Sequence, residues 1–174
     1  TGVISGNLAA VVSGAMVDLN GQTVSSGTIL LNSNGPALML SSLTGGLWNS
    51  SSSAASFTGT LLMQYPSTVG GEGMLTLGSL TTLAGGASLT KSGANTLVLS
   101  QASTGYTTPI TVARGMLRIA DPNALGPGST TTIASGAVLD VFGQTFNEAL
   151  TISGSGFVGA GTLIGFTSSS PLSA

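Results

Sequence analysis

The sequence contains neither cysteine nor histidine. Without cysteine the chain can form no disulfide bond, and without either residue it lacks the commonest ligands of zinc and related metals. Histidine is also the side chain most often used as a general base. We therefore assign no catalytic, cofactor-binding or metal-binding residue from the sequence, and we expect the protein not to be an enzyme.

Charged residues are also scarce. Three basic and five acidic residues make eight in 174, or 5%, whereas an ordinary globular domain has about 25%. The net charge of −2 offers no electrostatic attraction to nucleic acid or to an anionic membrane. No apolar run approaches the roughly 18 residues of a transmembrane helix, so we expect this segment not to enter a membrane. The first residues lack the basic segment of a signal peptide, which we expect to have been removed or to lie outside this sequence.

Glycine, serine and threonine dominate what is present. The chain has 27 Gly, 26 Ser and 23 Thr, and 41% of its residues are hydrophobic, which favours a buried core over disorder. Short runs of alternating apolar and polar residues recur between Gly, Asn, Asp and Ser, a pattern typical of strands. The clearest predicted strands cover residues 28–31, 60–63, 74–77, 96–99, 115–119 and 137–141. A helical turn is expected only at residues 122–125.

An internal repeat connects the two ends of the chain. Residues 13–23 and 135–145 share Ser-Gly-Ala, an aspartate and Gly-Gln-Thr at a constant offset of 122 residues (135 − 13). Self-similarity of this kind is typical of solenoids, in which each coil buries its apolar face against its neighbours. We therefore predict an all-β fold over residues 1–174, a right-handed parallel β-helix (β-solenoid). With roughly 20 to 25 residues per coil, it has about seven or eight coils.

An antiparallel β-sandwich is the alternative fold. It requires recurring hairpin turns of the Asn-Gly type, and only Asn20-Gly21 fits. Within the solenoid, residues 49–56 are expected to form a loop that leaves the regular coil, and residues 167–174 a Ser-rich tail.

Residues 86–164 resemble the autotransporter-associated β-strand repeat of bacterial type V secreted proteins. The resemblance rests on Leu89-Thr-Lys-Ser-Gly-Ala-Asn-Thr-Leu-Val-Leu-Ser100, Gly115-Met-Leu-Arg-Ile119, Asn123-Ala-Leu-Gly126 and Gly136-Ala-Val-Leu-Asp140. Pro109 departs from the repeat pattern and indicates a bend or a strand edge there. The resemblance implies a right-handed parallel β-helix exported to the bacterial surface, with a structural role and no shared catalytic residues.

Two groups of residues could be interpreted as sites. Asp18 and Asp140 could form a carboxylate pair acting on glycans. Because they occupy matching positions of the repeat, we expect each instead to form an Asx-type hydrogen bond before Gly21 or Gly143. Gly70-Gly-Glu-Gly73 is similar to a calcium-binding β-roll repeat, but a single copy without aspartate makes calcium binding the less favoured interpretation.

The remaining candidates have simple structural interpretations. We expect Lys91, Arg114 and Arg118 at solvated strand or turn positions, and we give no functional meaning to the glycosylation-like sequence Asn49-Ser50-Ser51. The aromatic residues are expected to pack in the core or at the caps. They are Trp48, Phe57, Tyr65, Tyr106, Phe142, Phe146, Phe157 and Phe166. Trp48, beside the serine-rich loop, is the one we would test for glycan binding.

Together these features predict a structural extracellular β-helix of a bacterial surface protein that serves as scaffold, stalk or adhesin. The expected partner is a second copy of the chain, stacked end to end into fibres, and a cell-surface or extracellular glycan is a further possible partner. A carbohydrate-binding or glycan-cleaving β-helix is the alternative function. The sequence identifies no ligand-binding residue with which to choose between them.

Overall fold

The structure is a computed structural model that describes residues 9–36, 45–83, 85–145, 148–153 and 163–164. The described residues form sixteen strands and contain no helix, so none of them belongs to a helix that could span a membrane. In chain order the strands are β1 (Ala9–Val11), β2 (Val17–Asp18), β3 (Thr23–Val24), β4 (Thr28–Leu31), β5 (Leu47–Asn49), β6 (Ala55–Met63), β7 (Ser67–Gly71), β8 (Leu75–Thr82), β9 (Leu89–Lys91), β10 (Thr96–Leu99), β11 (Ile110–Val112), β12 (Met116–Ile119), β13 (Thr130–Ile133), β14 (Val138–Asp140), β15 (Ala149–Ile152) and β16 (Leu163–Ile164).

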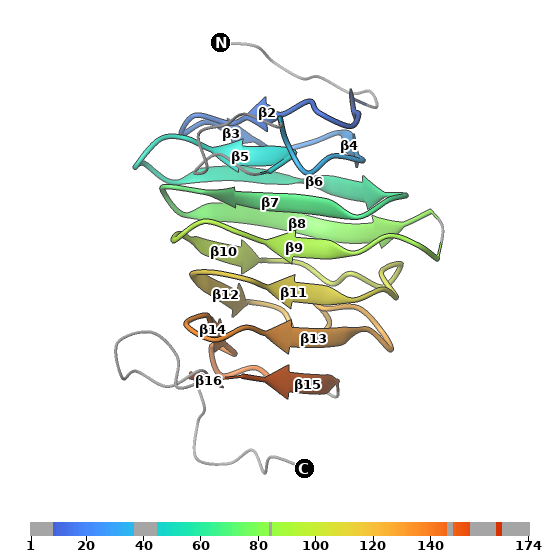
Figure 1. The fold of residues 1–174 in the computed structure, drawn as a ribbon, viewed down its shortest axis with the longest axis vertical. Coiled ribbons are helices and arrows are strands. Elements are labelled where there is room, and N and C mark those ends of the chain that lie inside the picture. Colours follow the sequence, from blue (N-terminus) through green and yellow to red (C-terminus); the bar gives the residue numbers. More distant parts are fainter. Residues whose placement is uncertain (1–8, 37–44, 84, 146–147, 154–162, 165–174) are drawn as a thin grey trace.

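The strands form two sheets that face each other across the core (Figure 1). Sheet A has the order β1-β4-β6-β8-β10-β12-β14-β16, with β3 also paired to β6, and sheet B has the order β2-β5-β7-β9-β11-β13-β15. Every pairing between described strands is parallel, as between β10 and β12. The chain alternates between the sheets as it descends the stack, in a right-handed coil of the kind that parallel crossovers favour. The predicted β-solenoid is confirmed.

Most coils have nearly the same length. Leu75 pairs with Leu97, an offset of 22 residues (97 − 75). Near the N-terminus Ile29 pairs with Leu61, an offset of 32 (61 − 29), because 15 residues (47 − 31 − 1) separate β4 from β5. The solenoid has about six turns, slightly fewer than the seven or eight predicted.

The core consists of apolar side chains stacked at matching positions of successive coils. Leu75, Leu97, Leu117 and Leu139 are consecutive register partners in sheet A, and all four are fully buried. Each such side chain contributes about 1.5–3 kcal/mol by leaving water. Because strand residues alternate between the two faces, Met116 next to Leu117 faces outward and is only half-buried.

The predicted strands all occur, and residues 122–125 form turns as expected, in which the Ala124 amide donates to the Asp121 carbonyl oxygen at 3.0 Å. One local prediction is wrong. Residues 49–56 are not a loop that leaves the coil, because Asn49 ends β5 and Ala55 begins β6. Only the tight corner 50–54 lies between the two strands. The predicted Ser-rich tail, residues 167–174, lies outside the described residues.

The 122-residue repeat is local and does not correspond to a whole number of coils. Asp18 pairs with Trp48 in sheet B, whereas Asp140 pairs with Arg118 in sheet A. The two copies nevertheless fold alike, because both aspartates are followed by two residues with positive φ. These are Asn20 (44°) and Gly21 (73°) in the first copy, and Phe142 (47°) and Gly143 (74°) in the second. The repeat is thus a strand-and-corner module used at two different corners.

Asn20-Gly21, the one pair that fits a hairpin turn in the sequence, forms instead the corner between β2 in sheet B and β3 in sheet A. The prediction of a bend or a strand edge at Pro109 is confirmed. Pro109 lies directly before β11, and its carbonyl oxygen accepts hydrogen bonds from the Leu89 amide at 3.0 Å and the Tyr106 hydroxyl at 2.9 Å. The proline therefore lies at a strand boundary, where the hydrogen bonds between strands require no backbone N–H group from it.

Candidate functional site

A groove of about 520 Å³ lies at the corner where the chain passes from sheet B to sheet A. Its lining comes from three consecutive coils, at the β9–β10, β11–β12 and β13–β14 connections. Small residues form the corner itself, namely Ala94, Ala113, Gly115, Ser135 and Gly136. Because these side chains fill little space, the corner is hollow over a height of about 10 Å, which is two strand spacings.

The side of the groove formed by sheet A has larger side chains. Thr96, Met116 and Val138 are consecutive register partners on β10, β12 and β14, and all three line the groove. Arg114 also lines it and is exposed to solvent. The groove therefore combines an apolar surface, two hydroxyl groups from Thr96 and Ser135, and one positive charge.

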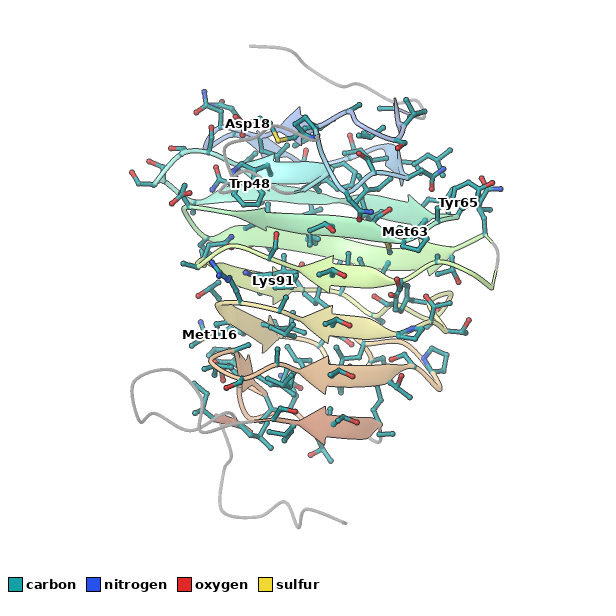
Figure 2. The ribbon with its side chains drawn as sticks, in the orientation of Figure 1. Asp18, Trp48, Met63, Tyr65, Lys91 and Met116 are labelled. Atoms are coloured by element: carbon teal, nitrogen blue, oxygen red, sulfur yellow. The ribbon has the colours of Figure 1, made fainter. Side chains whose placement is uncertain are left out.

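Lys91 lies behind this groove, where its side chain contacts the backbone of the lining residue Arg114. Its Nζ atom donates hydrogen bonds to the carbonyl oxygens of Ser92 at 2.6 Å, Gly93 at 2.9 Å and Arg114 at 3.1 Å. Burial lowers the pKa of Lys91 to about 7. Figure 2 shows Lys91 and Trp48 toward one side of the stack and Tyr65 toward the opposite side. The ammonium group thus connects the corner after β9 to the corner of the next coil.

The prediction that Lys91 is solvated is wrong, because the residue is fully buried. The alternation in β9 was the available signal: Leu89 faces the core, so Lys91, two residues later, faces it as well. Its register partners Val69 and Val112 are also fully buried. The corner carbonyl groups that accept its hydrogen bonds could not be recognised before the coils were placed.

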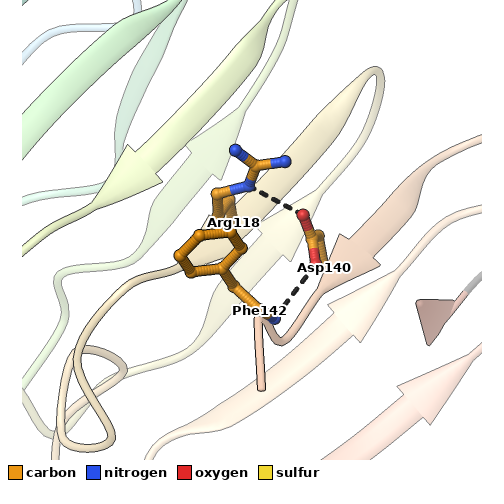
Figure 3. A network of polar contacts seen from close by, with 3 residues as sticks. All are labelled: Arg118, Asp140 and Phe142. Carbon is orange, nitrogen blue, oxygen red and sulfur yellow. Dashed lines mark hydrogen bonds and ion pairs between the residues drawn. The ribbon is translucent and has the colours of Figure 1, made fainter. Parts of the chain in front are cut away.

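Next to the groove, Arg118, Asp140 and Phe142 form a polar network on the outer face of sheet A (Figure 3). Arg118 Nε lies 2.7 Å from Asp140 Oδ2, and the Phe142 amide donates to Asp140 Oδ1 at 3.0 Å. The Arg118 guanidinium lies over the Phe142 ring, 4.8 Å from its centre. Arg118 follows Met116 by two residues on β12, so the network and the groove share one face of the sheet.

The two aspartates of the repeat do not form a carboxylate pair. Asp18 Oδ1 accepts hydrogen bonds from the amides of Asn20 at 2.9 Å and Ser50 at 3.0 Å, and the Ser50 hydroxyl donates to Oδ2. Burial raises the pKa of Asp18, but these hydrogen bonds outweigh it and lower the pKa below its ordinary value. The expected Asx-type hydrogen bonds are confirmed for Asp18 and Asp140.

The Gly70–Gly73 segment brings neighbouring coils close together. A Cβ atom would lie 2.4 Å from the Ser92 carbonyl oxygen at Gly70 and 2.5 Å from that of Ser51 at Gly73, so side chains are excluded. Within the part of the chain that the structure describes, no three acidic, His or Cys residues are grouped as metal ligands.

The aromatic residues divide into buried and exposed groups. Trp48 is fully buried, so the idea that it contacts a glycan is not supported, and Phe57 and Tyr106 also belong to the core. Tyr65 and Phe142 are more than half exposed, contrary to the expectation that they pack in the core or at a cap. Phe146, Phe157 and Phe166 lie outside the described residues.

Asn49, which matches a glycosylation acceptor, is a buried link between coils. Its Nδ2 donates to the carbonyl oxygens of Ser53 at 2.9 Å and Met74 at 3.1 Å. Its Oδ1 accepts from the amides of Gly21 at 2.9 Å and Ser51 at 3.2 Å. Three successive coils meet at this amide, which is enclosed in the folded chain.

A second, smaller hollow of about 350 Å³ lies beside Tyr65, Asn32 and Asn34. Its amide oxygens already have partners within the chain. Asn32 Oδ1 accepts from the Gln64 amide at 3.0 Å, and Asn34 Oδ1 accepts from the Thr68 hydroxyl at 2.8 Å. The first groove is therefore the stronger candidate site.

Comparisons of the chain with protein-family models, curated proteins and solved structures find no match. The structure defines the chain as a parallel β-solenoid. The resemblance of residues 86–164 to the autotransporter-associated repeat stays a prediction.

Proposed function

We propose that this chain is a structural β-solenoid of a bacterial surface protein, which serves as scaffold, stalk or adhesin and stacks end to end with further copies. The extracellular location and the bacterial origin rest on the resemblance of residues 86–164. The proposal of stacking rests on the two ends of the solenoid.

The observation that carries the proposal is that the apolar core continues to both terminal strands. Leu150 on β15 and Leu163 on β16 pack against the core at one end, and Val17 and Val24 do so at the other. Among the described strands, β15 pairs only with β13, and β2 pairs only with β5. A strand edge of this kind accepts a further strand, and natural proteins normally cover or charge it.

The orientation of β15 supports pairing beyond the chain. The Ser153 amide donates to the Ile133 carbonyl oxygen at 2.9 Å, toward β13. Because neighbouring strand residues direct their backbone groups to opposite sides, Ile152 presents its amide and carbonyl groups to the outer edge. Its side chain is 42% exposed. The outer edge of β15 thus combines backbone hydrogen-bonding groups with an exposed apolar side chain.

Sedimentation velocity across a range of chain concentrations tests the proposal. We expect the native chain to associate with rising concentration and the Ile152→Lys variant to remain monomeric, because an edge lysine blocks strand addition. Leu83→Lys is the matched control, since Leu83 is 58% exposed and lies beyond β8 in the middle of the stack. This control should associate like the native chain. A native chain that is monomeric throughout, or equal effects of the two variants, contradicts stacking.

A further inference from the structure

We propose that the groove at the corner between sheets B and A binds a small amphiphilic anion, an aliphatic or aromatic carboxylate. The apolar body lies against Met116, Ala94 and Ala113, and the carboxylate pairs with Arg114. This is a ligand-binding role beyond the structural one, on the side of the stack.

The apolar surface and the size of the groove fit such a ligand. Met116 is half-buried and lines the groove on β12, and Ala94 and Ala113 line it at the corner. Its volume of about 520 Å³ lies within the range of about 300–1,000 Å³ that is usual for small-molecule sites. Among the described residues of the lining, side-chain hydroxyls belong to Thr96 and Ser135 alone. A polyhydroxylated sugar would need more partners than these, whereas an alkyl chain or an aromatic ring needs none.

Charge complementarity identifies the other end of the ligand. The three basic residues of the chain, Lys91, Arg114 and Arg118, all lie between β9 and β12. The one ion pair among the described residues joins Arg118 to Asp140, and none of the described residues that line the groove is acidic. Arg114 is the basic residue of this lining, and its planar guanidinium fork matches a carboxylate.

The backbone that carries Arg114 is held in place before any ligand arrives. Lys91 Nζ donates to the Arg114 carbonyl oxygen at 3.1 Å. At Gly115 the φ angle is +70°, and a Cβ atom there would lie 2.5 Å from the Asn95 carbonyl oxygen. The corner therefore tolerates only glycine at this position and packs directly on the coil above. A groove that is formed in advance loses little conformational entropy on binding.

Isothermal titration calorimetry with octanoate tests the proposal, with the uncharged octanamide as the comparison ligand. We expect saturable binding of one octanoate per chain and at least about tenfold weaker binding of octanamide, because a hydrogen bond to a charged group is lost. Arg114→Gln should weaken octanoate binding by about the same factor and leave octanamide binding unchanged. Ala113→Leu should reduce the binding of both ligands, because the added side chain fills the groove.

Arg118→Gln is the matched control for Arg114→Gln, since Arg118 lies on the same face but outside the lining. It should keep native octanoate affinity, and circular dichroism should show that all variants stay folded. The absence of saturable octanoate binding overturns the proposal. Equal affinities for octanoate and octanamide, or an unchanged affinity in Arg114→Gln, overturn it as well. The groove and the outer edge of β15 are tested by different substitutions and different readouts, so failure here leaves the sedimentation test of end-to-end stacking unaffected.

Discussion

Among the described residues, Asp140 accepts hydrogen bonds from two groups on the outer face of sheet A, whereas Arg118 donates to Asp140 alone. Asp140 accepts from Arg118 Nε at 2.7 Å and from the Phe142 amide at 3.0 Å. The Arg118 side chain is 36% exposed, and that of Asp140 is 5% exposed. The Asp140 carboxylate therefore stabilises the corner after β14 and also forms the ion pair with Arg118.

We expect Asp140→Ala to lower the free energy of unfolding by more than Arg118→Ala does. The ion pair is partly solvated and contributes about 0.5–1 kcal/mol, whereas the lost bond to the Phe142 amide adds about 1 kcal/mol. Urea unfolding of both variants and of the double mutant measures these contributions. Equal losses in the two single variants would show that the corner does not depend on Asp140.

Phe142 adopts a conformation that costs free energy. Its φ angle is 47°, which is unfavourable for a bulky side chain, while the matching position of the repeat holds Asn20 at 44°. Phe142→Asn should stabilise the chain by about 0.5–1 kcal/mol, because relief of about 1–3 kcal/mol of strain exceeds a cation–π contact of about 0.5–1 kcal/mol. Thermal unfolding measures the change. A lower melting temperature would indicate that the contact with Arg118 outweighs the strain.

Lys91 makes stability depend on pH. Its pKa falls from an ordinary value of 10.5 to about 7 on burial, so between these values the unfolded chain binds more protons than the folded chain. Stability should therefore rise as pH increases from about 7 toward 10.5. Comparison of urea unfolding of the native chain and Lys91→Met at pH 7 and pH 9.5 isolates this contribution. The difference between them should shift in favour of the native chain at the higher pH, and a constant difference contradicts the account.

Glu148 has the opposite dependence. Ser129 Oγ lies 3.0 Å from both the Leu125 carbonyl oxygen and Glu148 Oε1. The Ser129 hydroxyl donates to Glu148 Oε1, which favours the charged carboxylate and lowers the pKa of Glu148, but burial outweighs this hydrogen bond. Burial raises the pKa of Glu148 from an ordinary 4.5 to about 7.

The stabilisation from Glu148 should be complete below about pH 4.5 and lost as pH rises through about 7. Glu148→Gln keeps a side-chain donor and removes the titration. The free energy of unfolding of the native chain relative to this variant should fall between pH 4.5 and pH 8. A difference independent of pH would show that the folded chain holds no proton at Glu148.

The sequence predicted the architecture because the solenoid repeats one simple rule in every coil. Alternation placed Leu97 and Leu117 in strands with their side chains on one face, and parallel stacking then made them register partners. The predicted count of coils was slightly too high because it assumed one coil length for the whole chain, whereas the offset is 22 residues between Leu75 and Leu97 and 32 between Ile29 and Leu61. Asx hydrogen bonds at Asp18 and Asp140 were predictable because they depend on neighbouring residues alone.

The groove could not be predicted, because its residues are separated in sequence. Ala94, Arg114 and Ser135 meet only when the corners of three coils are stacked, and this requires the length of each coil to be known. The burial of Lys91 could have been inferred from its place two residues after Leu89, but general expectations about lysine outweighed that signal. Hydrogen bonds between residues close in sequence could be predicted, whereas contacts between coils could not.

Electron microscopy of the purified chain without denaturant, combined with diffraction from aligned material, tests the structural proposal most directly. The account predicts unbranched filaments with an axial spacing of about 4.8 Å, because stacked copies continue the strand ladder across each junction. Dispersed short rods of single-chain length, at concentrations where the chain is fully folded, would contradict end-to-end stacking.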